Sequence, residues 1–253
     1  QFTIIKADIL ISLSGGIIVK KLLADMHMHT LVSGHAYGTI REMAAAAAEK
    51  ELSLIGITEH APGIPGTVDP FYYLNLEVIP RTIYGVEVLH GSEINVLNDG
   101  TLSLGQRYID HLDYAIAGIH MQCYENAGCD QNTTNLIECM KHDKVRFVSH
   151  PDDDRTPLDY DRLVQAARDY HVALEVNNSS LIKKEKRVNC YDNYRTMLDL
   201  CQQYRVPITV SSDAHDPSGV GNFTLALELL EEIGFDEDLI LTNDIDKLKS
   251  FIR

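Results

Sequence analysis

The sequence has no tryptophan, and its five cysteines are an odd number without a Cys-x-x-Cys pair. This pattern excludes a disulfide framework and a zinc ribbon as organising features. We therefore expect reduced thiols and a cytoplasmic protein. Basic residues are also scarce, with 22 Lys and Arg against 37 Asp and Glu and a formal charge of −15. Such a charge repels nucleic acid and anionic membranes, and a protein of this kind needs bound metal ions or another local positive charge to attract an anionic substrate.

Long apolar runs are missing too. The apolar stretch from Ile9 to Val19 is interrupted by serines and a glycine pair, and it is shorter than the ~20 residues that span a bilayer. We treat residues 1–23 as an amino-terminal extension of unknown role. Three interpretations stay open for it: an extra strand or hairpin around Gly15 and Gly16, sequence foreign to the native protein, and an export signal.

The remaining 24–253 segment alternates strand-like and helix-like stretches without a linker or repeat, and its length fits one domain. Thr39 and Glu42 have capping-box spacing before an alanine-rich helix, and Gly234 is placed to end the last predicted helix. The predicted strands lie within residues 21–29, 52–60, 85–96, 112–120, 145–150, 171–178 and 206–215. Strands that alternate with helices favour a parallel sheet, and about seven of them predict a seven-stranded, distorted (β/α) barrel.

Seven of the eleven histidines lie at or just beyond the carboxyl ends of these strands, and two acidic residues have equivalent positions. This is the face of α/β barrels that carries active sites. The nine residues are His27, His29, His35, His60, Glu93, His120, His150, Asp213 and His215. The other histidines, at 90, 111, 142 and 171, lack this placement, and we interpret them as structural or exposed.

Imidazole and carboxylate groups are ligands for zinc, manganese and iron. In the His27-x-His29 pair both rings lie on one side of a strand, so Met26 and Met28 are expected to pack on the other side. Taken alone, His-x-His describes surface loops as well as metal sites, and Asp213-x-His215 also fits a turn. Nine ordered candidates exceed what one ion binds, so two or three ions are implied.

These motifs resemble the PHP (polymerase and histidinol phosphatase) superfamily and, within it, the YcdX-type phosphatases. The resemblance extends over residues 24–245. The matching segments are DMHMHTLVSGHAYGT, GITEHAPG, IPRTIYGVEVLHGSEIN, DYAIAGIH, VSHP, LEVNNSS and SSDAH.

The resemblance implies a distorted (β/α)7 barrel with three divalent transition-metal ions, zinc first and manganese or iron as alternatives. One ion would be bound by His27, His29, Glu93 and Asp213. Glu93 would bridge to a second ion, bound by His120 and His150, and a third would be bound by His35, His60 and His215.

The activity expected from these features is hydrolysis of small-molecule phosphomonoesters by metal-activated hydroxide. Glu93, Asp213 and His215 are the expected catalytic residues, and Arg81 and Arg155 are candidate phosphate clamps. A phosphodiesterase or 3′-5′ exonuclease, a histidinol-phosphate phosphatase and a non-catalytic metal-binding module are the alternatives. The physiological substrate, the leaving-group acid and the oligomeric state stay open.

Overall fold

The protein is described by a computed structural model over residues 21–253. Its centre is a sheet of seven parallel strands, each paired with the next along the chain. The strands are β1 (Ala24–Met28), β2 (Leu54–His60), β4 (Val86–Asn95), β5 (Ala115–Gly118), β6 (Val145–Val148), β7 (Ala173–Asn177) and β8 (Ile208–Ser211). A short strand, β3 (Thr82–Ile83), pairs antiparallel with β4.

The sheet curls until β1 meets β8. At the carboxyl ends of the two strands, Met28 and Ala214 form a bridge, and the His29 amide donates to the Ala214 carbonyl at 2.8 Å. At the amino ends a 3₁₀ turn, η6 (Leu241–Asn243), lies between them, and Leu23 donates to the Thr242 carbonyl. The result is a nearly closed barrel, so the predicted distorted (β/α)7 architecture is confirmed.

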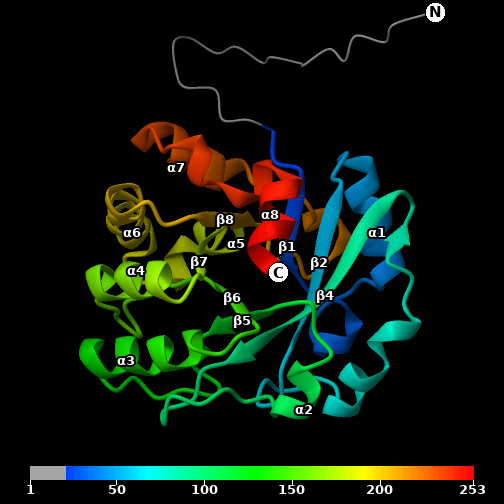
Figure 1. Ribbon diagram of the computed structural model, residues 1–253, viewed down its shortest axis with the longest axis horizontal. Coiled ribbons are helices and arrows are strands. Elements are labelled where there is room, and N and C mark those ends of the chain that lie inside the picture. The colour runs from blue at the N-terminus through cyan, green and yellow to red at the C-terminus, as the bar shows by residue number, and fades with distance from the viewer. Residues whose placement is uncertain (1–20) are drawn as a thin grey trace, which may run out of the picture.

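Helices cover the outside of this barrel, and α3, α4 and α6 lie side by side along one flank (Figure 1). The capping box of Thr39 and Glu42 opens α1, and Gly234 ends α7 in the left-handed conformation, as predicted. The α-helices are α1 (Ile40–Glu49), α2 (Gln106–Ile109), α3 (Cys129–Met140), α4 (Tyr160–Asp169), α5 (Asn178–Ile182), α6 (Cys190–Tyr204), α7 (Thr224–Ile233) and α8 (Ile245–Ile252). The other 3₁₀ segments are η1 (Leu31–Ser33), η2 (Pro70–Val78), η3 (Lys184–Lys186), η4 (Pro217–Gly219) and η5 (Glu237–Leu239).

Two apolar clusters form the core. The larger one lies between strands and helices, and the smaller one gathers strand residues with Leu248 and Phe251 of α8. Met26 belongs to the smaller cluster and Met28 to the larger one, so the expectation that both pack on the same side was wrong. The physical reason is an irregularity in the pairing of β1 with β2 between Asp25 and Met28, which breaks the simple alternation.

The barrel begins slightly before residue 24. Leu22 is buried in the larger cluster, and Leu23 is hydrogen-bonded to η6. The strand or hairpin proposed around Gly15 and Gly16 lies outside the described residues. Within residues 21–253 no helix combines the length and apolar character needed to cross a membrane.

Candidate metal centre

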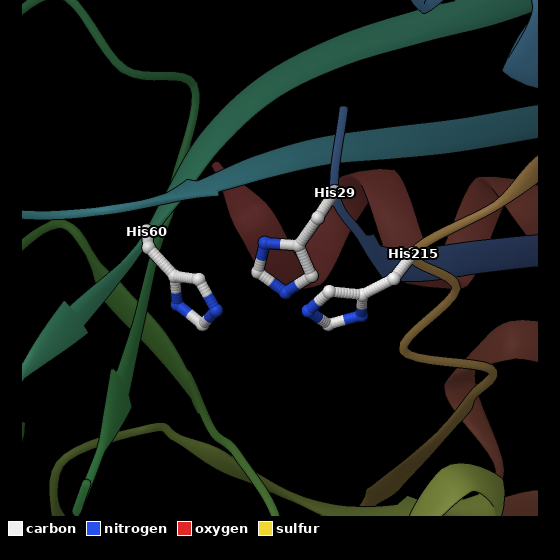
Figure 2. A group of neighbouring side chains, drawn as sticks. All are labelled: His29, His60 and His215. Carbon is white, nitrogen blue, oxygen red and sulfur yellow. The ribbon is translucent and has the colours of Figure 1, made fainter. Parts of the chain in front are cut away.

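The structure brings all nine predicted ligand residues together at the carboxyl ends of the strands. They come from six strands or the segments after them: His27, His29 and His35 from β1 and the loop beyond it, His60 and Glu93 from β2 and β4, His120 and His150 after β5 and β6, and Asp213 and His215 after β8. Figure 2 shows three of them, His29, His60 and His215, with their rings turned toward one another. Residues almost 190 positions apart in the sequence thus share one site.

The first group consists of His27, His29 and Asp213, and one oxygen of Glu93 completes it. The two Nε2 atoms of His27 and His29 are 3.1 Å apart. Asp213 Oδ1 lies 3.3 Å from the His29 Nε2 atom, and Glu93 Oε2 lies 3.3 Å from the His27 Nε2 atom. Two imidazole nitrogens and two carboxylate oxygens, all possible metal ligands, therefore face a common point.

The second group forms around the other oxygen of the same carboxylate. Glu93 Oε1 lies 3.1 Å from His120 Nε2 and 2.8 Å from His150 Nε2. Glu93 is 1% exposed and has one oxygen in each group. This is the geometry expected of a carboxylate between two cations.

The third group contains His35, His60 and His215. The Nε2 atoms of His35 and His215 are 3.2 Å apart, and the His35 and His60 rings stack with centroids 5.0 Å apart. His29 adjoins this group as well, because its donor atom lies within 4.8 Å of those of His60 and His215. The groups are thus contiguous, with His29 and Glu93 at their boundaries.

The outer ring nitrogens of three of these histidines are already engaged. The partners are Glu175 Oε1 for His27 Nδ1 at 2.8 Å, Ser33 Oγ for His29 Nδ1 at 3.1 Å and Asn95 Oδ1 for His120 Nδ1 at 2.7 Å. A carboxylate or amide oxygen only accepts, so the ring must donate from its outer nitrogen. The inner Nε2 then carries a lone pair, which is the arrangement found in metal-bound histidines.

When these rings are neutral, their inner atoms are acceptors that face other acceptors at close range. In the described part of the chain, Asp213 Oδ1 and His60 Nδ1 are buried without a hydrogen bond, although His60 Nδ1 lies only 3.0 Å from Glu93 Oε2. Burial opposes ionisation of Glu93, yet the neighbouring His120, His27 and His150 hold the pKa of this carboxyl well below its usual range. A buried carboxylate among lone pairs is unfavourable unless a cation lies between them, so these residues fit divalent metal ions.

The backbone is strained at two of the nine positions. His150 and Asp213 have φ angles of 30° and 52°, a region that side-chain-bearing residues rarely adopt. The Asp213 amide donates to the His27 carbonyl and the His150 amide to Glu175, and these bonds stabilise the strained conformations. Glycine is required beside the centre at 118, where a Cβ atom would lie 3.0 Å from Glu93 Oε1.

A cavity of about 270 Å³ opens over the centre. Two arginines line this cavity. Arg155 is ion-paired with Asp153. Arg187 is ion-paired with Asp152 and donates to the His150 carbonyl at 2.9 Å. Arg81 does not reach this cavity. It lies beside the amino-terminal half of β4, paired with Asp113, so its expected role as a phosphate clamp is corrected.

Sequence reasoning missed the residues behind the ligands, namely Ser33, Asn95, Glu175, Asn177 and Arg187. Glu175 and Asn177 carried a usable signal, since they are two positions apart on β7 and Asn177 donates to Glu175 at 3.0 Å. Ser33 and Asn95 stand among ordinary loop and strand residues, and nothing in the sequence around them indicated a role.

Comparison with known proteins now identifies the lineage. The sequence model described as the PHP domain matches residues 25–205. The chain belongs to the PHP domain family. A probable phosphatase of Thermoanaerobacter sp. strain X514 is 37% identical over 237 residues, which cover 92% of this chain and 95% of that protein. A probable phosphatase of Clostridium novyi strain NT is 35% identical over 234 residues, with coverage of 92% and 95%.

Among solved structures, this PHP protein resembles histidinol phosphate phosphatase from Lactococcus lactis, determined with zinc, L-histidinol and phosphate. The TM-score is 0.55 at 16% identity, over 85% of this chain and 95% of the other. The similarity supports the fold. The family resemblance drawn from the motifs is confirmed, and the protein is a phosphatase of this family.

Proposed function

We propose that this PHP protein hydrolyses small-molecule phosphomonoesters at a centre of three divalent metal ions. The observation that carries the proposal is the position of Glu93, whose two carboxylate oxygens face two separate groups of imidazoles. The third group, around His35 and His215, adjoins the first through His29. Three contiguous groups of donors match three ions better than one.

The proposed ligands divide as the groups do. The first ion would be held by His27, His29, Glu93 and Asp213, the second by Glu93, His120 and His150, and the third by His35, His60 and His215. Zinc is the first choice, and the zinc in the Lactococcus lactis structure is in keeping with it. When bound, such ions would provide hydroxide from water near neutral pH and neutralise phosphoryl oxygens.

The chain's own residues would orient the substrate. Arg155 and Arg187 line the cavity over the centre and present guanidinium groups, whose planar geometry matches phosphate. Glu93, Asp213 and His215 also line it, so they would be the catalytic residues closest to the phosphoryl group. The cavity of about 270 Å³ and its apolar wall, formed by Ile64, Ile119 and Met121, suit a small leaving group better than a polynucleotide.

The burial of the centre also has a chemical consequence. His27, His29 and Glu93 are 0–1% exposed, so charges at the centre interact through a medium of low dielectric. A phosphate would approach from the open side, where His215 and the two arginines lie. We therefore expect the phosphoryl end of the substrate to enter first and the leaving group to face Met121.

The test compares p-nitrophenyl phosphate, bis-p-nitrophenyl phosphate and a single-stranded oligonucleotide, with protein prepared in Mn²⁺ or Zn²⁺. We expect hydrolysis of the monoester, loss of activity with a chelator and recovery when the metal is returned. Elemental analysis should find about three ions per chain, as the proposed ligand sets require. Cleavage of the diester or oligonucleotide alone, or fewer than about one ion per chain, would refute the proposal.

A further inference from the structure

Ser33 contacts two histidines that we assign to different ions, although it is not placed to bind either ion itself. Its Oγ atom lies 3.1 Å from His29 Nδ1, and it accepts from the His60 backbone amide at 3.0 Å. Ser33 is 0% exposed, so no solvent competes for these bonds. His29 belongs to the first group and His60 to the third.

Glu59 determines which way the Ser33 hydroxyl points. The Ser33 Oγ atom donates to Glu59 Oε2 at 2.6 Å, and Glu59 also accepts from the Thr30 amide at 3.1 Å and from the Thr30 hydroxyl. Among residues 21–253, all hydrogen-bond donors to this buried carboxylate therefore come from one turn of chain, Thr30 to Ser33. Glu59 precedes the ligand His60 directly and has no other role in the centre.

The single hydrogen of the Ser33 hydroxyl determines the tautomer of His29. A serine hydroxyl has one hydrogen and two acceptor lone pairs. The hydrogen goes to Glu59, one lone pair accepts from the His60 amide, and the second lone pair is left for His29. Since Ser33 can only accept there, His29 must carry its proton on Nδ1, and its Nε2 is left free to bind a cation.

We propose that Glu59 and Ser33 form a positioning pair that fixes the tautomer of His29 and the place of His60, and thereby couples the first and third metal sites. This inference rests on the proposed function for the assignment of both histidines as ligands. Neither Glu59 nor Ser33 touches the substrate or an ion in this arrangement. Their effect passes through the two imidazoles.

The proposal predicts what happens when the carboxylate is removed. In a Glu59→Leu variant the Ser33 hydrogen has lost its acceptor at position 59, and it turns toward His29 Nδ1. The proton of His29 then moves to Nε2, the atom that faces the metal. Ser33→Ala removes the acceptor altogether and leaves the tautomer of His29 unrestrained.

The experiment measures the tautomer and metal affinity separately from activity. Nitrogen-15 spectra of the imidazoles in the metal-free protein should show His29 protonated on Nδ1 in the wild type and on Nε2 in Glu59→Leu. Mn²⁺ titration followed by electron paramagnetic resonance should show binding weakened about 10- to 100-fold in both variants. Ser92→Ala is the matched control, because Ser92 is a buried serine that is hydrogen-bonded to Tyr73 and the Glu59 carbonyl and, among the described residues, to none of the nine proposed ligand side chains.

Wild-type Mn²⁺ affinity in Glu59→Leu and Ser33→Ala, or a His29 proton on Nε2 in the metal-free wild type, would overturn the inference. The wild-type spectrum decides the tautomer even if a variant does not fold. If the wild type binds no metal or hydrolyses no monoester, the proposed function fails instead. The spectrum still tests the positioning pair on its own.

Discussion

The two ends of this barrel are built from the same strands and have opposite chemistry. At the carboxyl end, eight buried or half-buried imidazoles and carboxylates and the exposed His35 lie close together. At the amino end, the strands place apolar side chains against α8, which packs as a plug. Along β2, Leu54 in the apolar cluster and His60 in the centre are six positions apart. Phe147 of β6 in the apolar cluster and His150 in the centre are three positions apart.

The comparison indicates that stability and function are separable in this fold. Burial of apolar surface stabilises the amino end by roughly 25 cal/mol per Å², whatever the metal content. The carboxyl end is unfavourable without cations, because buried acceptors lie 2.8–3.5 Å apart. Changes at one end should therefore alter metal binding and catalysis, and changes at the other should alter folding alone.

The largest expected effect comes from Glu93→Gln at the carboxyl end. The amide keeps the shape of the side chain and its contact with Ser149, but it loses the charge shared by two groups. We expect kcat/KM to fall about 10³-fold, the upper range for losing one electrostatic contact in an active site. Metal analysis should show that about two of three ions are lost.

The same variant tests the comparison through stability. In the presence of chelator, its free energy of unfolding should equal or exceed that of the wild type, because a buried charge has been removed. With metal, the wild type should gain about 2.7 kcal/mol per site at a hundredfold excess of ion over Kd, and the variant should gain less. A variant that keeps its metal and its activity would refute the bridging role.

The next effect is Phe251→Ala at the amino end. Phe251 is 8% exposed, lies with its ring centroid 4.1 Å from that of His171, and belongs to the same cluster as Phe147. Removing it leaves a cavity under α8, and we expect a loss of about 3 kcal/mol in the free energy of unfolding. Denaturant titration measures the loss, which should be equal with and without metal. Reduced metal content in the folded variant would show that the two ends are coupled.

The carboxyl end was the more predictable of the two. The nine candidate ligands could be grouped from the sequence because metal chemistry limits the residue types and because strand ends converge in a barrel, so His27 and Asp213 lie together despite their separation in sequence. The family motifs then divided the ligands into groups. Seven strands and the boundaries of α1 and α7 followed from periodicity and capping signals.

What could not be predicted depends on exact contacts. The helix α8 has only eight residues, and its own sequence does not show where it packs. It closes the amino end because the fold places Leu248 and Phe251 against the apolar residues of the strands. Ser33 gained its role because η1 turns its hydroxyl toward Glu59. The sequence did not distinguish Arg81, which follows a proline, from Arg155, which follows an acidic run. The fold does so, because it places Arg155 at the cavity and Arg81 beside Asp113.

That pair of arginines gives a smaller, sharper test. Arg155→Ala should raise KM for a phosphomonoester about tenfold, equivalent to about 1.4 kcal/mol, because a guanidinium near the phosphate is lost. Arg81→Ala is the matched control and should leave KM and kcat within about twofold. Steady-state kinetics on p-nitrophenyl phosphate distinguishes the two variants. Equal effects in both would mean that the cavity does not receive the phosphate.

The smallest effect at neutral pH concerns His90, a buried histidine outside the centre. It is 1% exposed, and neither ring nitrogen has a hydrogen-bond partner among the described residues. Burial, aided by the charge of Arg81, lowers the pKa of His90 to about 4. The unfolded chain binds this proton near pH 6.5, so the group weakens the fold as pH falls from 6.5 toward 4.

His90→Leu should therefore raise the free energy of unfolding by about 1 kcal/mol at pH 7, where only unsatisfied polar atoms are removed. At pH 5 the gain should grow by about 2 kcal/mol, since the variant has no proton to bind on unfolding. Denaturant titrations at both pH values measure this, with the exposed His111→Leu as control. Unlike His29, whose outer nitrogen is held by Ser33, His90 has no partner that would orient it toward a cation. A gain at pH 5 without loss of metal would therefore show that burial alone does not make a histidine part of the centre.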